Sequence, residues 1–232
     1  MKLGQLLDWM DAAHPNAYTP EQKTAWVNDL EAILWTQICL QPMSLLRPYI
    51  PEEDGRTRLL LPDGWRRVYT AYLGAMIDFA NGEYTQYEND MSLYNGYINE
   101  LGAWYADAFA PAQNPARWVT AGVFEYADLL GEGATVAALP PDGALLCAEY
   151  RTEVPGDGKL ILTAGEAELG DSVYITNENG KLLYTPGLVL TAGREEKVNL
   201  RYDGDEEKDG CVSLRLLVQP PARRNSLHNG VT

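Results

Sequence analysis

The residue types that most often carry out chemistry in proteins are sparse in this sequence. Of 232 residues, two are histidines and three are cysteines. His14 lies in a turn that is typical of a helix end, and His228 lies in a polar tail, so neither can anchor a Ser-His-Asp, Cys-His or His-rich metal site. The scattered cysteines Cys39, Cys147 and Cys211 match neither a disulfide framework nor a zinc-ligand spacing, and we expect buried thiols.

The acidic stretch DGDEEKDG has part of the spacing of a calcium-binding loop. It places Asp203, Asp205 and Glu207 at alternate positions. Such a loop requires glycine at its sixth position and a bidentate glutamate at its twelfth, but Lys208 and Leu214 occupy them. A solvated hairpin loop is therefore the better interpretation, and no carboxylate pair stands out for glycoside hydrolysis.

Short catalytic motifs are also missing from the sequence. No phosphate-loop, dinucleotide-binding, nucleophile-elbow or zinc-protease pattern occurs. The glycine pairs at 131–133 and 156–158 lack the following helix signals that a phosphate loop needs. We therefore expect no catalytic residue, no cofactor and no metal, and a protein that is not an enzyme.

Residues 82–105 (GEYTQYENDMSLYNGYINELGAWY) are the strongest candidate for contact with another protein. Large apolar side chains recur there at steps of three and four, the spacing of one helix face; they are Tyr84, Tyr87, Met91, Tyr94, Ile98, Leu101 and Tyr105. Tyr97 and Trp104 widen this tyrosine seam toward its end. Because a buried tyrosine hydroxyl needs a partner, we expect mostly core, with the rest at a subunit interface formed by Tyr84, Tyr87 and Tyr97.

Trp35 is a further interface candidate. The helix expected over residues 20–40 carries most of its apolar side chains on one face, and at 3.6 residues per turn Trp35 falls on roughly the opposite face. We therefore expect Trp35 to be partly exposed in the single chain or covered by another chain. The alternative is that the irregular stretch 41–61 wraps the bundle and buries both faces.

Composition divides the chain near Trp118, since all six tryptophans lie at or before it. The first part predicts helices over about 3–12, 20–40, 64–80 and 83–110. Thr19-Pro20-Glu21-Gln22 is typical of a helix start with a capping box, and Asn81-Gly82 is typical of a helix end.

The second part predicts β-structure, because six short apolar runs follow one another at spacings of 8–15 residues with turns between them. The expected fold class is α+β, with an N-terminal four-helix α domain followed by a small antiparallel β-sandwich or barrel domain. We place the helical domain at 1–111, a linker at 112–142, the β-domain at 143–220 and a disordered tail at 221–232.

The chain is strongly acidic. Before Val119 there are 8 Lys/Arg and 15 Asp/Glu, and from Val119 on there are 10 and 18, so the two parts carry −7 and −8 of the net charge of −15. This disfavours binding to a phosphate backbone. No apolar run approaches the ~20 residues that span a bilayer, and the first residues lack the pattern of a signal peptide, so we expect cytoplasmic synthesis.

A set of residues spread over about 3–110 forms a distinctive pattern, made up of His14-Pro15-Asn16, Tyr18 to Lys23, Trp26-Val27, Leu30-Glu31, Leu60 to Asp63, Val68-Tyr69, Tyr72-Leu73, Ala75 to Tyr84, Tyr87-Glu88-Asn89 and Tyr94-Asn95. In these residues the helical part resembles a family of prophage-encoded structural or head–tail connector (adaptor) proteins of long-tailed bacteriophages. The run from Ala75 to Asn89 is the most distinctive. Members of that family mostly end soon after the fourth helix, so the resemblance does not extend to the β-domain.

The resemblance implies a virion structural protein that assembles at the portal vertex. Its implied partners are the portal and neighbouring subunits, with no sequence-specific nucleic acid and no membrane, and it would be a monomer or weak oligomer in isolation. Its implied location is the bacterial cytoplasm during assembly and then the virion. The alternative is a binding module whose β-domain recognises a carbohydrate or a protein; an unrecognised enzyme is the third hypothesis.

Overall fold

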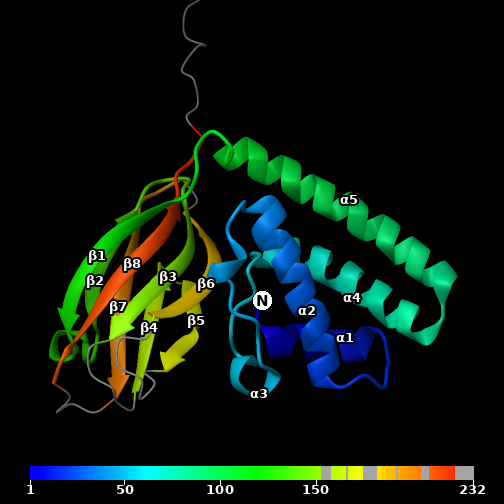
Figure 1. The fold of residues 1–232 in the computed structure, drawn as a ribbon, viewed down its shortest axis with the longest axis horizontal. Helices are drawn as coiled ribbons and strands as arrows, with labels where there is room; N and C mark the ends of the chain where they lie inside the picture. The colour runs from blue at the N-terminus through cyan, green and yellow to red at the C-terminus, as the bar shows by residue number, and fades with distance from the viewer. Residues whose placement is uncertain (153–157, 166, 175–181, 192, 205–208, 223–232) are drawn as a thin grey trace, which may run out of the picture.

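Helices build the first half of the chain and strands build the second (Figure 1). The structure is a computed structural model that describes residues 1–152, 158–165, 167–174, 182–191, 193–204 and 209–222. The helices are α1 (Leu3–Ala13), α2 (Pro20–Ile33), the short α3 (Pro51–Asp54), α4 (Arg66–Asn81) and α5 (Tyr84–Phe109). The predicted fold class, with four main helices followed by an antiparallel β-sandwich, is confirmed.

The capping signals operate where the sequence predicts them. The Gln22 N–H donates to the Thr19 hydroxyl at 3.3 Å, and the Thr19 N–H donates to the Gln22 side chain at 3.0 Å, which completes the capping box of α2. Gly82 has a φ of +77° and caps α4. A left-handed residue stops a helix, and glycine adopts that conformation without steric cost. The chain therefore reverses between α4 and α5 and forms a helical hairpin (Figure 1).

The β-part is a sandwich of two antiparallel four-stranded sheets. The first sheet has the order β1-β8-β3-β6, formed by Arg117–Glu125, Cys211–Gln219, Ala144–Thr152 and Leu182–Leu190. The second has the order β2-β7-β4-β5, formed by Ala134–Leu139, Glu196–Gly204, Gly158–Ala164 and Ala167–Tyr174. All six runs expected from the sequence become strands.

The stretch 112–142, which the sequence suggests is a linker, differs from that expectation. It contains β1, a short 3-10 turn at Tyr126–Leu129, and β2, and so it contributes one edge strand to each sheet. The alternation of β1 is hard to recognise because its register shifts between Thr120 and Gly122, where Gly122 has a φ of +150°. A bulge of this kind interrupts the period-two pattern on which strand prediction depends.

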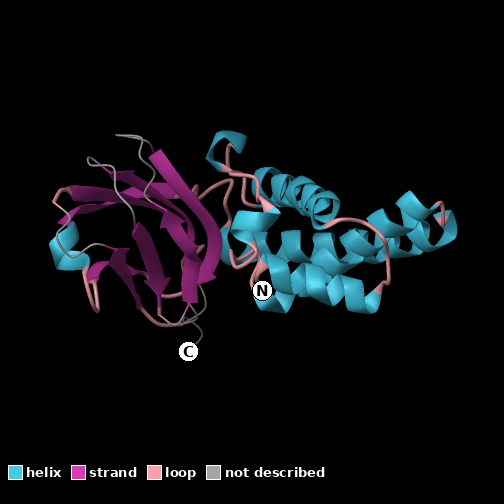
Figure 2. Ribbon diagram, turned by 90° about the horizontal axis from the view of Figure 1, so that it is seen from below, coloured by secondary structure: helices cyan, strands magenta, loops and turns pink. Residues whose placement is uncertain are grey.

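The first sheet is covered on both faces. Leu145, Ala148 and Tyr150 of β3 belong to the core between the two sheets, whereas Leu146 and Cys147 belong to the core shared with the helices. Two consecutive residues face the helices because the register of β3 shifts between Leu145 and Cys147. The helices and the sandwich therefore share one apolar layer, and Figure 2 shows the helical layer lying against the sandwich.

Two expected features fall wholly or mainly outside the described residues. These are the central part of the acidic loop, including Asp205, Glu207 and Lys208, and residues 223–232 of the expected tail. Of that tail, Ala222 is described, and its N–H donates to the Ala108 carbonyl at 2.9 Å. In the described ranges, every helix is too short or too polar to traverse a lipid bilayer.

Candidate functional site

Three aromatic side chains gather at the turn between α4 and α5. The Phe79 ring lies 6.0 Å from that of Tyr84 and 5.2 Å from that of Tyr87, between ring centroids. Phe79 is 51% exposed and Tyr84 is 62% exposed. We call these three residues the aromatic tip; the turn that carries them is the end of the hairpin that lies farthest from the sandwich (Figure 1).

The aromatic tip is held in place by the start of α2. The Tyr18 hydroxyl donates to Asn81 Oδ1 at 2.8 Å, and the Tyr18 ring packs edge-on against Trp26 at 5.3 Å. The Glu83 N–H donates to the Asp78 carbonyl at 2.8 Å, which closes the turn. The turn is therefore held by hydrogen bonds on both sides of Gly82, through the Asn81 side chain and the Glu83 backbone.

The stretch of sequence that contains the aromatic tip has acidic side chains but no Lys or Arg. Residues 68–116 contain no Lys or Arg and six acids, which are Asp78, Glu83, Glu88, Asp90, Glu100 and Asp107. Burial and the neighbouring carboxylate of Asp90 raise the pKa of Asp78, while His14 opposes this shift. The exposed rings of Phe79 and Tyr84 thus lie in a stretch of sequence whose Asp, Glu, Lys and Arg side chains are all acidic.

The structure brings Tyr84 and Tyr87 together against Phe79, and it places Tyr97, the third residue of the predicted interface, elsewhere on α5. Tyr97 lies 13 residues beyond Tyr84 on the same helix, about 20 Å along the axis at 1.5 Å per residue. Its ring is covered by the Arg67 guanidinium, which stands 4.7 Å from the ring centroid. Tyr97 is half-buried and belongs to the contact between α4 and α5 rather than to the tip.

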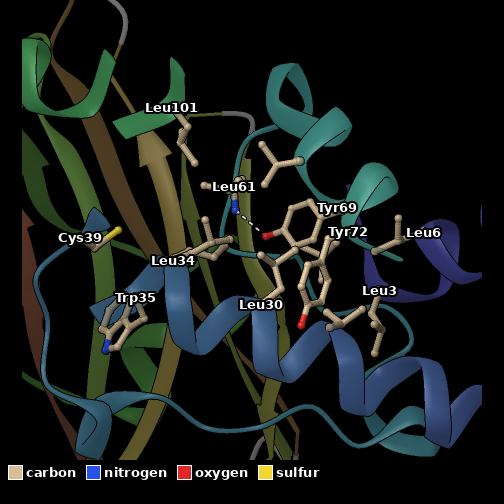
Figure 3. Close-up of a cluster of buried hydrophobic side chains, with 14 of the residues drawn as sticks. Leu3, Leu6, Leu30, Leu34, Trp35, Cys39, Leu61, Tyr69, Tyr72 and Leu101 are labelled. Carbon is tan, nitrogen blue, oxygen red and sulfur yellow. Dashed lines mark hydrogen bonds between the residues drawn. The ribbon is translucent and has the colours of Figure 1, made fainter. Parts of the chain in front are cut away.

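The expectation that Trp35 is partly exposed is wrong. Its side chain has no exposed surface and lies in the buried cluster of Figure 3. Its Nε1–H donates to the Pro42 carbonyl at 3.0 Å. The burial agrees with the alternative, in which the segment that begins at residue 41 covers this face. After the π-helical turn Leu34–Ile38 the chain folds back, and the Gln41 N–H donates to the Trp35 carbonyl at 3.0 Å.

The tyrosine seam changes from surface to core along α5. Tyr94, Leu101 and Tyr105 are buried, and the Tyr94 ring packs 5.2 Å from that of Tyr72 on α4. Tyr84, at the start of the helix, is exposed. The expectation of a seam that is mostly core with an exposed remainder describes this gradient.

Sequence reasoning missed Phe79. It lies one helical turn before Gly82, while Tyr84 and Tyr87 follow in the next helix, so its contacts cross the reversal of the chain. The available signal was an aromatic residue three positions before a glycine that ends a helix. That spacing places the ring beside the first turn of the helix that returns.

Glu31 and Tyr69 form a buried polar pair inside the helical core. The Tyr69 hydroxyl donates to Glu31 Oε1, and the Leu60 N–H donates to the same oxygen at 3.0 Å. The Leu61 N–H donates to the Tyr69 hydroxyl at 3.1 Å (Figure 3). Burial raises the pKa of Glu31 to about 7, against the opposing hydrogen bonds from Tyr69 and Leu60. Because Glu31 is enclosed, it acts on the stability of the fold and not on a substrate.

No protein-family model matches the chain. Among curated proteins, the chain is similar to the tRNA 5-methylaminomethyl-2-thiouridine biosynthesis bifunctional protein MnmC of Stutzerimonas stutzeri (strain A1501), with 29% identity over 171 residues that cover 69% of this chain and 24% of that protein. The protein of the same name from Ectopseudomonas mendocina (strain ymp) is 32% identical over 110 residues, which cover 47% of this chain and 14% of that protein. The chain therefore spans a quarter or less of the length of these relatives.

This similarity contradicts the expectation that the chain is not an enzyme, because the name of these relatives describes a bifunctional biosynthetic protein. Identities of 26–32% over part of the chain make the link to an enzyme weak. The expectation gave too much weight to missing motifs. A motif search detects only groups that lie close together in the sequence, whereas many sites join residues from distant elements.

Solved structures with a low overlap include chains of viral capsids. The Cyanophage Pam1 capsid asymmetric unit contains a chain that matches with a TM-score of 0.34 and 14% identity, covering 46% of this chain and 86% of that one. The acid-stable capsid of Helicobacter pylori bacteriophage KHP30 contains another, with a TM-score of 0.30 and 13% identity, covering 44% and 86%. Overlaps this low carry no argument about function.

Proposed function

We propose that the chain is a structural subunit of a bacteriophage virion, of the head–tail connector type, and that the aromatic tip contacts another virion protein. The proposal rests on the resemblance of residues 3–110 to prophage-encoded connector proteins. The portal and neighbouring copies of the subunit are the partners that this function requires.

The exposure of the aromatic tip is the observation that carries the proposal. All three rings fall within the most distinctive run of the resemblance, from Ala75 to Asn89. Phe79 and Tyr84 are exposed where they contribute little to the core of their own chain. Exposed aromatic side chains on a rigid turn are typical of the residues that dominate the energetics of protein interfaces.

The charges around the tip describe the surface that it would contact. The surrounding acids favour a partner with Lys or Arg around an apolar depression, since complementary charge speeds association and fixes orientation. The net charge of −15 also opposes self-association at low salt. We therefore expect a monomer or weak oligomer in isolation that assembles only on a template, by contacts between two different surfaces of neighbouring copies.

A gene deletion in an inducible prophage tests this function. Loss of the subunit should leave leaking or DNA-filled heads separated from tails, as seen by electron microscopy. Complementation with the variant Phe79→Ser/Tyr84→Ser/Tyr87→Ser should fail to restore joined particles. Complementation with Met43→Ser, which removes an equally exposed apolar side chain (52%) from the short 3-10 helix Met43–Leu45, should restore them.

Complete particles that fail only to adsorb to cells would contradict the connector function. The leading interpretation would then be a binding module that recognises a carbohydrate or a protein through its β-domain. The edge strand β1 favours this second candidate, because Val123 is 66% exposed and the described pairing of β1 is with β8 alone. An edge of this kind accepts an added strand from a partner.

The curated relatives favour a third candidate, a module of a tRNA-modifying protein. The similarity covers up to 69% of this chain. The net charge of −15 opposes it, because binding to a phosphate backbone draws on Lys and Arg. A gel-shift measurement with bulk tRNA at low salt separates the candidates: binding would favour the tRNA module, and its absence would favour the structural subunit.

A further inference from the structure

A cavity lies where the end of α5 meets the sandwich. Its volume is about 600 Å³, and its walls come from the last turns of α5, the turn between β2 and β3, the end of β6 and the two residues after Pro220. Cavities between two packed units are the usual location of binding sites in proteins, and this volume lies within their usual range. We call it the junction cavity.

Hydrogen bonds hold the walls of the junction cavity. The Ala222 N–H donates to the Ala108 carbonyl at 2.9 Å. The Asp142 N–H donates to the Thr191 carbonyl at 2.7 Å, and Asp142 Oδ1 accepts from the Gly193 N–H at 2.8 Å. The cavity is therefore formed in advance of any ligand, which lowers the cost of ordering upon binding.

Three sources of negative charge border the junction cavity: the Asp107 side chain, the C-terminal end of α5 and the Asp142 side chain. Asp107 lies in the last turn of α5, where the helix dipole places a partial negative charge, and that turn contains no basic residue. Asp142 lines the opposite wall, on the sandwich. Among the residues that the structure describes, the cavity is lined by neither Lys nor Arg. An acid at the end of a helix is unfavourable there, and a bound cation would relieve the repulsion.

The same cavity has an aromatic wall. Trp104 and Phe109 both line it, and their rings pack edge-on at 6.0 Å. Trp104 is also fixed from its other side by Trp65 at 5.4 Å. Indole rings attract cations electrostatically, and guanidinium groups stack on them most often.

We propose that the junction cavity binds an arginine side chain presented by a protein partner. A planar guanidinium group donates in two directions, toward the two carboxylates, while its plane and its aliphatic stem lie against the aromatic wall. The cavity is too large and too apolar for a bare metal ion, and the two acids have no place in a site for an anion. This proposal does not rest on the connector function, because it uses a surface distinct from the aromatic tip.

The test uses two small probes of nearly the same shape: acetyl-arginine methylamide, whose guanidinium group is charged, and acetyl-citrulline methylamide, whose ureido group is neutral. The indole N–H resonance of Trp104, identified with Trp104→Phe, is followed by NMR in the full chain. The arginine probe should shift this resonance saturably at low salt, and the citrulline probe should not. Asp107→Asn and Asp142→Asn should each weaken binding about tenfold, the scale of one charge-assisted hydrogen bond.

The outcomes separate the sources of the cation. Equal shifts with both probes, or unchanged affinity in both Asp variants, would overturn the proposal. The chain itself has Arg223 and Arg224 directly after the last described residue. If the probe binds only in the variant Arg223→Gln/Arg224→Gln, the arginines of this chain fill the cavity and the partner proposal is wrong; equal binding in the variant and the unaltered chain supports it.

Discussion

The hydroxyl of Tyr69 donates a hydrogen bond to the carboxyl group of Glu31 in the interior of the helical layer, 38 residues away along the chain. Both residues are buried, and Figure 3 shows Tyr69 among apolar side chains of the helical core. Burial raises the pKa of Tyr69 well above its usual range, so Tyr69 remains a donor, and burial also makes a charged Glu31 costly.

This relationship predicts a pH-dependent stability. The folded pKa of Glu31 is about 7, above its usual value of 4.5, so between these values the folded state binds more protons than the unfolded state. The free energy of unfolding should therefore fall as pH rises from about 4.5 to 7, by roughly 3 kcal/mol for this group. Glu31→Gln should remove this slope, measured as the difference in urea unfolding between variant and unaltered chain.

The matched control is Glu88→Gln, which removes the same charge from an exposed position on α5. It should leave the slope between pH 4.5 and 7 nearly unchanged. A Glu31→Gln variant that loses stability in parallel with the unaltered chain across this range would show that Glu31 is not the titrating group.

The second prediction contrasts two tyrosines of the seam. Tyr84→Ala removes an exposed ring and should change the free energy of unfolding by less than about 0.5 kcal/mol. Tyr94→Ala removes a buried ring that packs on Tyr72 and should cost about 3 kcal/mol or more. Chemical denaturation measures both, and similar costs would show that the aromatic tip is part of the core.

The third prediction concerns the thiols. Cys39 and Cys147 are buried and Cys211 is half-buried. Burial also raises the pKa of Cys39 to about 12, which suppresses its thiolate. A thiol reagent should therefore modify Cys211 first in the folded chain, and the other two only on unfolding. Cys211→Ser should abolish the early phase; an early phase that persists would contradict the burial of Cys39 and Cys147.

The fourth prediction tests the place of β2 in the sandwich. Gly133 has a φ of +75°, and an added Cβ would lie 2.4 Å from the Leu200 carbonyl oxygen on β7. Gly131 has a φ of +65° with no atom near such a Cβ. Gly131→Ala should cost about 1 kcal/mol, from the left-handed conformation alone, and Gly133→Ala clearly more. Equal losses in thermal unfolding would show that β2 does not approach β7 as described.

Local signals in the sequence determined where most elements begin and end. The capping box of Thr19 and Gln22 begins α2, Gly82 ends α4, and the six apolar runs from Ala144 to Gln219 become strands. These features depend on contacts among residues within a few positions of one another, so the order of residue types is sufficient to predict them.

Only the tertiary structure decided which faces of the helices and strands are buried and which distant side chains are in contact. Trp35 is covered because a π-helical turn and a returning segment meet there, and β1 and β2 join the sandwich through pairing with strands far along the chain. The contact of Phe79 with Tyr87, the enclosure of Glu31 and the junction cavity also join distant elements. Contacts of this range depend on how whole elements pack, which periodicity within one element does not encode.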